Sequence, residues 1–257
     1  MERIPIEEDG RTSHLAVRLD VPEAGGAPGV AVLYLHGFGS RQSGTKAEFF
    51  RRRFLDRGLA FCSFDFQGHG DSGGSMLDLT LSRNLSDVGR VHALLGERGY
   101  AAVVLMGSSM GGGSALWYAA RRPEGVAAAI HVAPSVALGE GLLEWVGPEN
   151  ARRWEREGKL LLEGEVASCE VGWGLIADLA DYRVERLRSI YRTPTLIFQG
   201  KNDASVPWRK VLDFVVGCRY EEIDLHLMAG ADHRMIDRLD YLWRLADAFL
   251  ATRGLVR

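Results

Sequence analysis

Residues 101–113 read AAVVLMGSSMGGG, and this stretch is the most informative about the fold. Its apolar first half, Ala101–Met106, predicts a buried strand, and Met110–Arg121 predicts a helix. Between them lies the pattern Gly-x-Ser-x-Gly, with Ser109 at its centre. A serine on a sharp turn from strand to helix is the setting in which this pattern indicates a nucleophile. The flanking glycines remove side chains that would collide in such a turn, and a helix N-terminus favours developing negative charge.

Two other interpretations of the stretch stay open at this point. Ser109 could be a plain N-cap of the helix that follows, since serine is a preferred N-cap residue. Ser108 is the nearest rival nucleophile, although the spacing of the glycines favours Ser109.

Strands and helices alternate outward from this stretch over most of the chain. The predicted strands are Arg3–Glu7, His14–Asp20, Val30–Leu35, Leu59–Asp65, Val126–Val132, Thr195–Gln199 and Ile223–Met228. The predicted helices are Thr45–Arg57, Leu81–Arg98, one from about Trp208, and Ile236–Thr252. Such alternation predicts an α/β fold with a mainly parallel central sheet flanked by helices. Ligands bind such sheets beyond the carboxyl ends of the strands, and every candidate site motif of this chain follows a predicted strand.

Residues 134–181 break the rhythm, and we expect them to form a small helical cap inserted between core segments 1–133 and 182–257. We expect short helices there and no clear strand. The insertion leaves from the carboxyl end of a strand, which places it above the site. We therefore expect Trp145, Trp154 and Trp173 to line a substrate pocket. The alternative is an insertion that only enlarges the core.

A nucleophilic serine needs a base, and the sequence offers seven histidines. In folds with this kind of turn the chain order is serine, acid, histidine. Only His226 and His233 follow Ser109 beyond a late strand, and only His233 lies on a loop. We therefore predict His233 as the base.

The acid is expected in the turn Gly200–Pro207, directly after the strand Thr195–Gln199. Asp203 is the choice, although an aspartate there could also be a structural Asx turn or a helix cap. Asp232 is adjacent to the base, where side chains seldom converge, and Asp178 and Asp181 fall at the end of the cap.

A tetrahedral intermediate also needs fixed donors for its negatively charged oxygen. One is expected to be the backbone N–H of Met110, directly after the nucleophile. The other is expected from the loop His36–Gly39, with the Phe38 N–H as the best candidate. A simple glycine turn is the alternative for this loop.

Bulk composition narrows the function classes further. The chain has 257 residues, 46% of them hydrophobic, and a net charge of −3, which gives no electrostatic footprint for nucleic acid. Neither a signal peptide nor an apolar run long enough to span a membrane is evident, and no motif predicts a metal or other cofactor. Three widely spaced cysteines are typical of a reducing cytoplasm, with a Cys169–Cys218 bridge as the alternative.

The motifs together resemble the α/β-hydrolase superfamily over nearly the whole chain. They are the His36–Gly39 loop, the Asp65–Ser72 stretch, the Gly107–Gly111 turn, Asp203 with Val206-Pro207, and Asp232–Arg234. A narrower set is similar to small serine hydrolases related to the mitochondrial palmitoyl-protein thioesterase with an α/β-hydrolase domain. That set comprises Gly37–Ser40, Gly44–Ala47, the Gly-Ser-Ser turn, Val206–Trp208 and Asp232–Arg234. The narrower resemblance implies cleavage of an acyl thioester or ester, although the transit peptide of a mitochondrial member is not seen.

The sequence therefore favours a serine hydrolase that cleaves a small-molecule ester or thioester through an acyl-enzyme. A serine nucleophile argues against dehalogenases and epoxide hydrolases of this fold, which use aspartate. A proline-type aminopeptidase stays open, because the cap contains carboxylates that could hold a substrate amine: Glu140, Glu144, Glu163, Glu165 and Glu170. These alternate with basic residues, so a solvated helix face is the other interpretation. A binding protein that has lost the chemistry is the alternative from another class, and the oligomeric state is left open.

Overall fold

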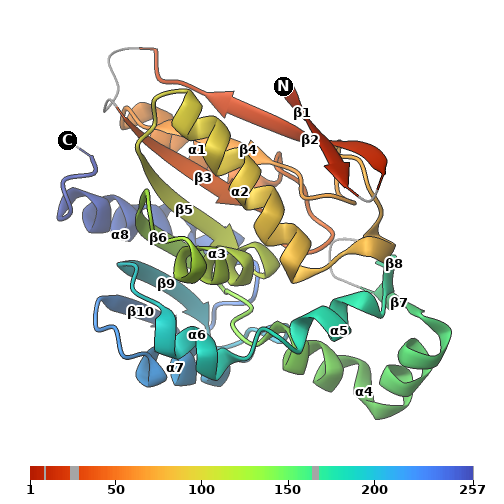
Figure 1. The fold of residues 1–257 in the computed structure, drawn as a ribbon. Helices are drawn as coiled ribbons and strands as arrows, with labels where there is room; N and C mark the ends of the chain where they lie inside the picture. Colours follow the sequence, from red (N-terminus) through yellow and green to blue (C-terminus); the bar gives the residue numbers. More distant parts are fainter. Residues whose placement is uncertain (9, 24–28, 164–167, 257) are drawn as a thin grey trace.

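The computed structural model describes residues 1–8, 10–23, 29–163 and 168–256 (Figure 1). Parts of the loops expected near residues 8–10 and 22–29 lie outside the described residues, as does Glu165 of the cap.

Within the described residues an eight-stranded sheet forms the centre of the molecule, in the order β1-β2-β4-β3-β5-β6-β9-β10. Its strands are β1 Glu2–Glu8, β2 Arg11–Asp20, β3 Val30–Leu35, β4 Ala60–Phe64, β5 Ala102–Ser108, β6 Val126–Val132, β9 Thr195–Gly200 and β10 Ile223–Met228. The first two strands join antiparallel, and all pairs from β4 to β10 are parallel. The predicted mainly parallel α/β sheet is confirmed.

Helices cover both faces of this sheet because the central strands are apolar on both sides (Figure 1). On β5, Val103 and Leu105 join one core cluster, whereas Val104 and Met106 join the other. The first cluster is covered by α2 Leu81–Glu97, α3 Met110–Arg121, α6 Val184–Ile190 and α7 Trp208–Gly217. The second is covered by α1 Thr45–Asp56 and α8 Leu239–Ala251. Two short 3₁₀ turns, Met76–Asp78 and Ile236–Arg238, precede α2 and α8.

The segment predicted as a cap, residues 134–181 (below, the cap segment), contains α4 Leu138–Glu157, β7 Lys159–Glu163, β8 Ser168–Gly172 and α5 Gly174–Leu179. Helix α4 is kinked at Gly147, whose φ is 76°, and Pro148 follows at once. Strands β7 and β8 pair antiparallel in a two-stranded sheet of their own. The expectation of no clear strand here was wrong. The run Leu160–Leu162 does not alternate in sequence, yet Leu160 and Leu162 are buried while Leu161 is exposed, which is the period of a strand.

The described residues contain neither a disulfide bond nor a helix that could span a membrane. The three cysteines are free thiols, so the alternative of a Cys169–Cys218 bridge is not realised. No helix among the described residues combines the length and the apolar character that crossing a membrane requires.

Candidate active site

Ser109 occupies a strained turn between β5 and α3. Its φ of 53° and ψ of −119° fall where side chains other than glycine are rarely found. Neighbouring backbone leaves no room for side chains on either side of it. A Cβ on Gly111 would lie 2.3 Å from the Leu35 carbonyl oxygen, and one on Gly107 would lie 2.6 Å from the carbonyl oxygen of Gly111. Gly111 is therefore required by the close approach of the turn to the end of β3, and Gly107 by its close approach to the first turn of α3.

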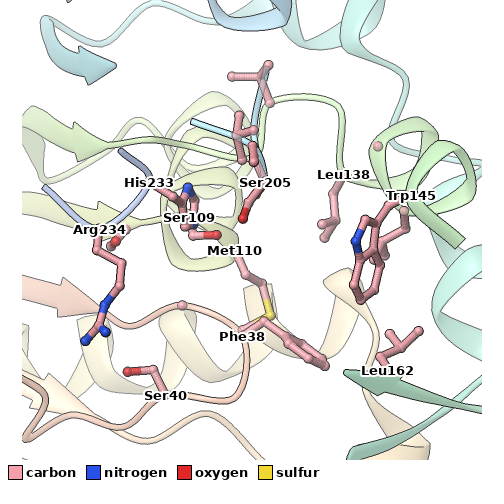
Figure 2. Close-up of a pocket in the computed structure, with 18 of the residues that line it drawn as sticks. Phe38, Ser40, Ser109, Met110, Leu138, Trp145, Leu162, Ser205, His233 and Arg234 are labelled. Atoms are coloured by element: carbon pink, nitrogen blue, oxygen red, sulfur yellow. The ribbon is translucent and has the colours of Figure 1, made fainter. Parts of the chain in front are cut away.

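Asp203 and His233 come from loops that follow the neighbouring parallel strands β9 and β10. His233 Nδ1 lies 2.8 Å from Asp203 Oδ2. Because an ionised carboxylate only accepts hydrogen bonds, Nδ1 is the protonated nitrogen of the neutral ring and Nε2 is free to accept a proton. His233 and Ser109 both line one cavity (Figure 2). Through its contact with His233, Asp203 lies next to the same cavity.

The Asp203 carboxylate is itself held by four donors. Its Oδ1 accepts from the backbone N–H groups of Ser205, at 2.9 Å, and Val206, at 2.7 Å. Its Oδ2 accepts from His233 and also from Gln199 Nε2, at 3.0 Å. The Asx turn that was an alternative for Asp203 is therefore present alongside the contact with His233.

The loop predicted to supply an oxyanion donor lies directly beside Ser109. A Cβ on Gly37 would lie 3.3 Å from the Cβ of Ser109. The Gly37 carbonyl accepts hydrogen bonds from His36 Nδ1, at 2.8 Å, and from the Ser40 N–H, at 3.1 Å. Because the peptide is trans, the Phe38 N–H points away from that carbonyl and is fixed in direction by it. Met110 is the first residue of α3, so its N–H has no acceptor within the helix.

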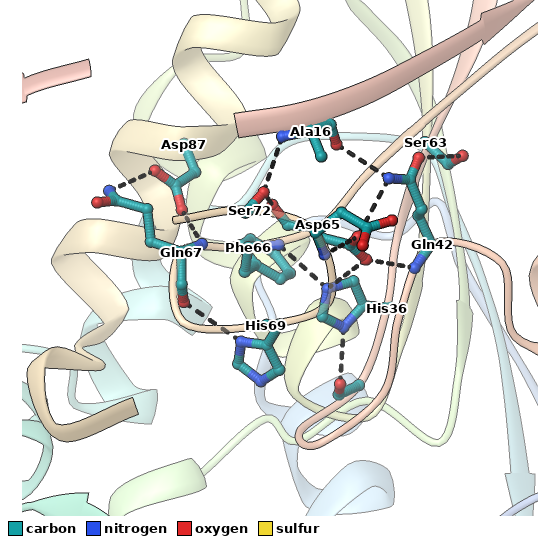
Figure 3. Close-up of polar contacts among 12 residues, drawn as sticks. Ala16, His36, Gln42, Ser63, Asp65, Phe66, Gln67, His69, Ser72 and Asp87 are labelled. Carbon is teal, nitrogen blue, oxygen red and sulfur yellow. Dashed lines mark hydrogen bonds and ion pairs between the residues drawn. The ribbon is translucent and has the colours of Figure 1, made fainter. Parts of the chain in front are cut away.

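His36 belongs to a buried polar network that holds this loop (Figure 3). Its Nε2 accepts from the Phe66 N–H at 3.1 Å, so Nδ1 carries the proton that Gly37 receives. Burial, with a contribution from nearby His69, lowers the pKa of His36 to about 3, which keeps the ring neutral. Sequence reasoning noted His36 as a loop residue near the site but did not identify this role, since the contact with Phe66 spans 30 residues.

Asp65 anchors the same network. It accepts from the Gln42 N–H at 2.7 Å, from Gln42 Nε2 at 3.1 Å and from the Asp71 N–H at 3.0 Å. A Cβ on Gly70 would lie 2.2 Å from Asp65 Oδ2, so the glycine allows the loop to close over the carboxylate. The Asp65–Ser72 stretch, which carried part of the family resemblance, thus forms the frame beneath the Phe38 loop.

Ser109 lines a cavity of about 420 Å³, whose lining residues are shown in Figure 2. Its wall is mainly apolar, and residues 134–181 supply part of it; the apolar residues include Phe38, Val136, Leu138, Leu142, Trp145 and Leu162. Ser40 and Arg234 line it on the side away from Trp145. No three His, Cys, Asp or Glu side chains in the described ranges are grouped as metal ligands would be.

The three predicted pocket tryptophans have different positions. Trp145 lines the cavity and is 55% exposed. Trp154 and Trp173 are not among the described residues that line the cavity. Trp154 is fully buried, donates from Nε1 to the Val171 carbonyl at 2.8 Å, and meets the Trp173 ring at a centroid distance of 5.7 Å. These two rings join α4 to the hairpin, so their expected place on the pocket wall was wrong.

Comparison with known proteins agrees with this geometry. The family described as "Serine aminopeptidase, S33" matches residues 26–163, more than half of the chain. Palmitoyl-protein thioesterase ABHD10, mitochondrial, of Mus musculus is 26% identical over 222 residues, which are 84% of this chain and 72% of that protein. The Bos taurus protein of the same name is 26% identical over 225 residues, 84% of this chain and 70% of that protein.

Solved structures share the whole fold. A protein from Agrobacterium vitis superposes with a TM-score of 0.84 and 25% identity, covering 96% of this chain and 97% of its own. Mouse alpha/beta hydrolase domain-containing protein 10 superposes with a TM-score of 0.81 and 23% identity, covering 98% of this chain and 99% of its own. The predicted resemblance to α/β hydrolases related to that thioesterase is confirmed.

Proposed function

This chain belongs to the family described as "Serine aminopeptidase, S33", and we propose that it cleaves carboxylic ester or acyl thioester bonds through a Ser109 acyl-enzyme. It is an α/β hydrolase by family and by fold. The observation that carries the proposal is the 2.8 Å contact between His233 and Asp203 at a cavity that Ser109 also lines.

In the proposed reaction, His233 Nε2 takes the proton of the Ser109 hydroxyl as its oxygen attacks the acyl carbon. The carbonyl bond electrons move to the oxygen, which accepts hydrogen bonds from the N–H groups of Phe38 and Met110. Collapse of this intermediate breaks the bond to the leaving alcohol or thiol, which receives the proton from His233. Water, deprotonated by His233, then releases the acid and restores Ser109. Asp203 keeps the imidazole in the required tautomer throughout.

The apolar cavity supports an apolar acyl group as the part of the substrate bound by the cap segment. We propose that residues 134–181 act as the cap of this site, with Trp145 on the acyl wall. The thioester alternative takes its support from the relatives, which are named as palmitoyl-protein thioesterases. A cytoplasmic location stays a prediction from cysteine usage.

The proposal is tested with p-nitrophenyl esters and acyl-CoA thioesters of graded chain length. Ser109→Ala should lower the turnover number by a factor on the order of a million, because the covalent step is lost. Ser108→Ala is the matched control, since it removes the neighbouring hydroxyl, and it should retain turnover. Loss of turnover in Ser108→Ala with retention in Ser109→Ala would contradict the proposal.

A second candidate function is that of a proline-type aminopeptidase, which the family description favours. Such an enzyme needs a carboxylate to hold the substrate amine, and Glu163 lines the cavity without an ion pair among the described residues. Two other carboxylates of the segment form ion pairs, Glu144 with Lys210 at 2.6 Å and Glu170 with Lys159 at 2.9 Å. Such pairs are common on solvated helix and hairpin faces. Release of nitroaniline from prolyl-p-nitroanilide, lost in Glu163→Gln, would favour this function over ester cleavage.

A further inference from the structure

We propose that Gln199, which the mechanism above does not use, is a positioning residue that fixes the Asp203 carboxylate toward His233. The inference rests on the proposed function, because it assigns Asp203 the part of the catalytic acid. Gln199 is fully buried near the end of β9, and it is not among the described residues that line the cavity. It can therefore act on the reaction only through a neighbour.

The surroundings of the Gln199 amide determine which way it faces. Its Nε2 lies 3.0 Å from Asp203 Oδ2, 3.0 Å from the Val206 carbonyl oxygen and 3.2 Å from the Gly200 carbonyl oxygen. All three neighbours are acceptors. With the amide reversed, Oε1 would face a carboxylate and two carbonyl groups with no hydrogen between them. The NH₂ group therefore points at the acid.

This orientation leaves the other end of the amide without a partner. Gln199 Oε1 is buried and accepts no hydrogen bond among the described residues. An unpaired buried acceptor destabilises a folded protein, and an apolar side chain of similar size would avoid that cost. A buried glutamine at this position is therefore explained by what its NH₂ group donates to.

The donated hydrogen bond falls on the carboxylate oxygen that matters for catalysis. Asp203 Oδ2 is the atom that receives His233 Nδ1–H, and Gln199 supplies its second donor. Two donors on Oδ2 and two on Oδ1 hold the carboxylate in one orientation. The bond to the Val206 carbonyl closes the same turn, so the amide holds both the acid and its loop.

The test compares Gln199→Met, which keeps the size and removes the donor, with Gln199→His, which can restore an N–H donor. We expect Gln199→Met to lower kcat on the order of 10- to 100-fold, as loss of a hydrogen bond to a charged group does, with KM unchanged. The low-field NMR signal of the His233 Nδ1 proton should move in Gln199→Met. Gln199→His should regain part of kcat.

Thr195→Val is the matched control on the same strand. It removes two buried hydrogen bonds of the Thr195 hydroxyl, 2.5 Å to Tyr191 and 2.8 Å to the Thr193 carbonyl, at the opposite end of β9. A purely structural role for Gln199 predicts that both variants lower thermal stability, leave the Nδ1 proton signal in place and leave kcat nearly unchanged. That result would overturn the proposal.

A double-mutant cycle separates this proposal from the proposed function. Adding Gln199→Met to Asp203→Asn should lower kcat no further, because the donor acts through Asp203. If Ser109→Ala and Asp203→Asn keep full activity, the proposed function fails. If both lose activity while Gln199→Met does not, only the assignment of Gln199 fails.

Discussion

The sequence was enough to select three candidate site residues, because each follows a predicted strand and the three stand in the expected order: Ser109, Asp203 and His233. The residues that orient these side chains could not be predicted. Gln199 reads as an ordinary end of a buried strand, and its role depends on which end of its amide faces Asp203. The tautomer of His36 likewise depends on the Phe66 N–H, which is remote in sequence.

Asp203→Asn should reduce turnover on the order of 10⁴-fold while the fold persists, as amide substitution of a triad acid does elsewhere. The Oδ1 atom of the substituted side chain can still accept from the Ser205 and Val206 N–H groups, which leaves its NH₂ group facing two donors, Gln199 and His233. The neutral His233 ring then has to carry its hydrogen on Nε2 instead of Nδ1, so Nε2 cannot take the proton of Ser109. Steady-state kinetics and circular dichroism on the purified variant measure both quantities.

Near-normal turnover in Asp203→Asn would move the acid role to Asp178 or Asp181. Asp178 already accepts hydrogen bonds from the Ser82 backbone N–H and hydroxyl at the start of α2. That engagement gives Asp178 a structural part in joining α5 to α2.

Among the helices and strands, long periodic segments were predictable and the cap segment was not. Central strands such as β3 and β9 are buried on both faces, so their apolar runs are plain in the sequence. The hairpin β7–β8 is buried on one face only, and the consecutive leucines at 160–162 conceal its alternation. Because the hairpin was not predicted, the sequence could not distinguish a tryptophan that packs α4 against it, as Trp154 does, from one that lines the cavity.

Trp145 and Trp154 should respond differently to replacement by alanine. Trp145→Ala enlarges the cavity and should shift the preferred acyl length toward longer chains. The shift should be graded, because one methylene changes selectivity by only ~1–3 kcal/mol. Trp154→Ala empties a fully buried site and should destabilise the fold by about 3–5 kcal/mol with the chain-length profile unchanged. The measurements are kcat/KM across graded esters and thermal denaturation; identical profiles for Trp145→Ala and the unmodified protein would refute the wall assignment.

For the whole molecule, burial of histidines makes stability depend on pH. His131 lies on β6 in the interior, and neither of its ring nitrogens has a partner among the described residues. Burial lowers its pKa from 6.5 to about 3. Between these values the unfolded chain binds a proton that the folded chain excludes, so unfolding becomes easier as the pH falls.

The free energy of unfolding should therefore fall as the pH drops from about 6.5 toward 3, by up to about 1.4 kcal/mol per pH unit for each such histidine. His131→Leu removes one of these groups and should flatten the slope by about that amount. Urea titrations at several pH values measure it. Superimposable slopes for the variant and the unmodified protein would show that His131 takes up no proton on unfolding.

The proposed role of Ser109 as the nucleophile is tested most directly by peptide mass spectrometry after treatment with a fluorophosphonate probe, which phosphonylates an activated serine. Ser109 lies in a strained turn and lines the cavity with His233. We expect one added probe mass per chain, located on Ser109, with loss of esterase activity in proportion to labelling and no labelling of Ser109→Ala. A probe mass on Ser108 or another serine, or full hydrolytic activity with Ser109 unlabelled, would contradict a catalytic role for Ser109.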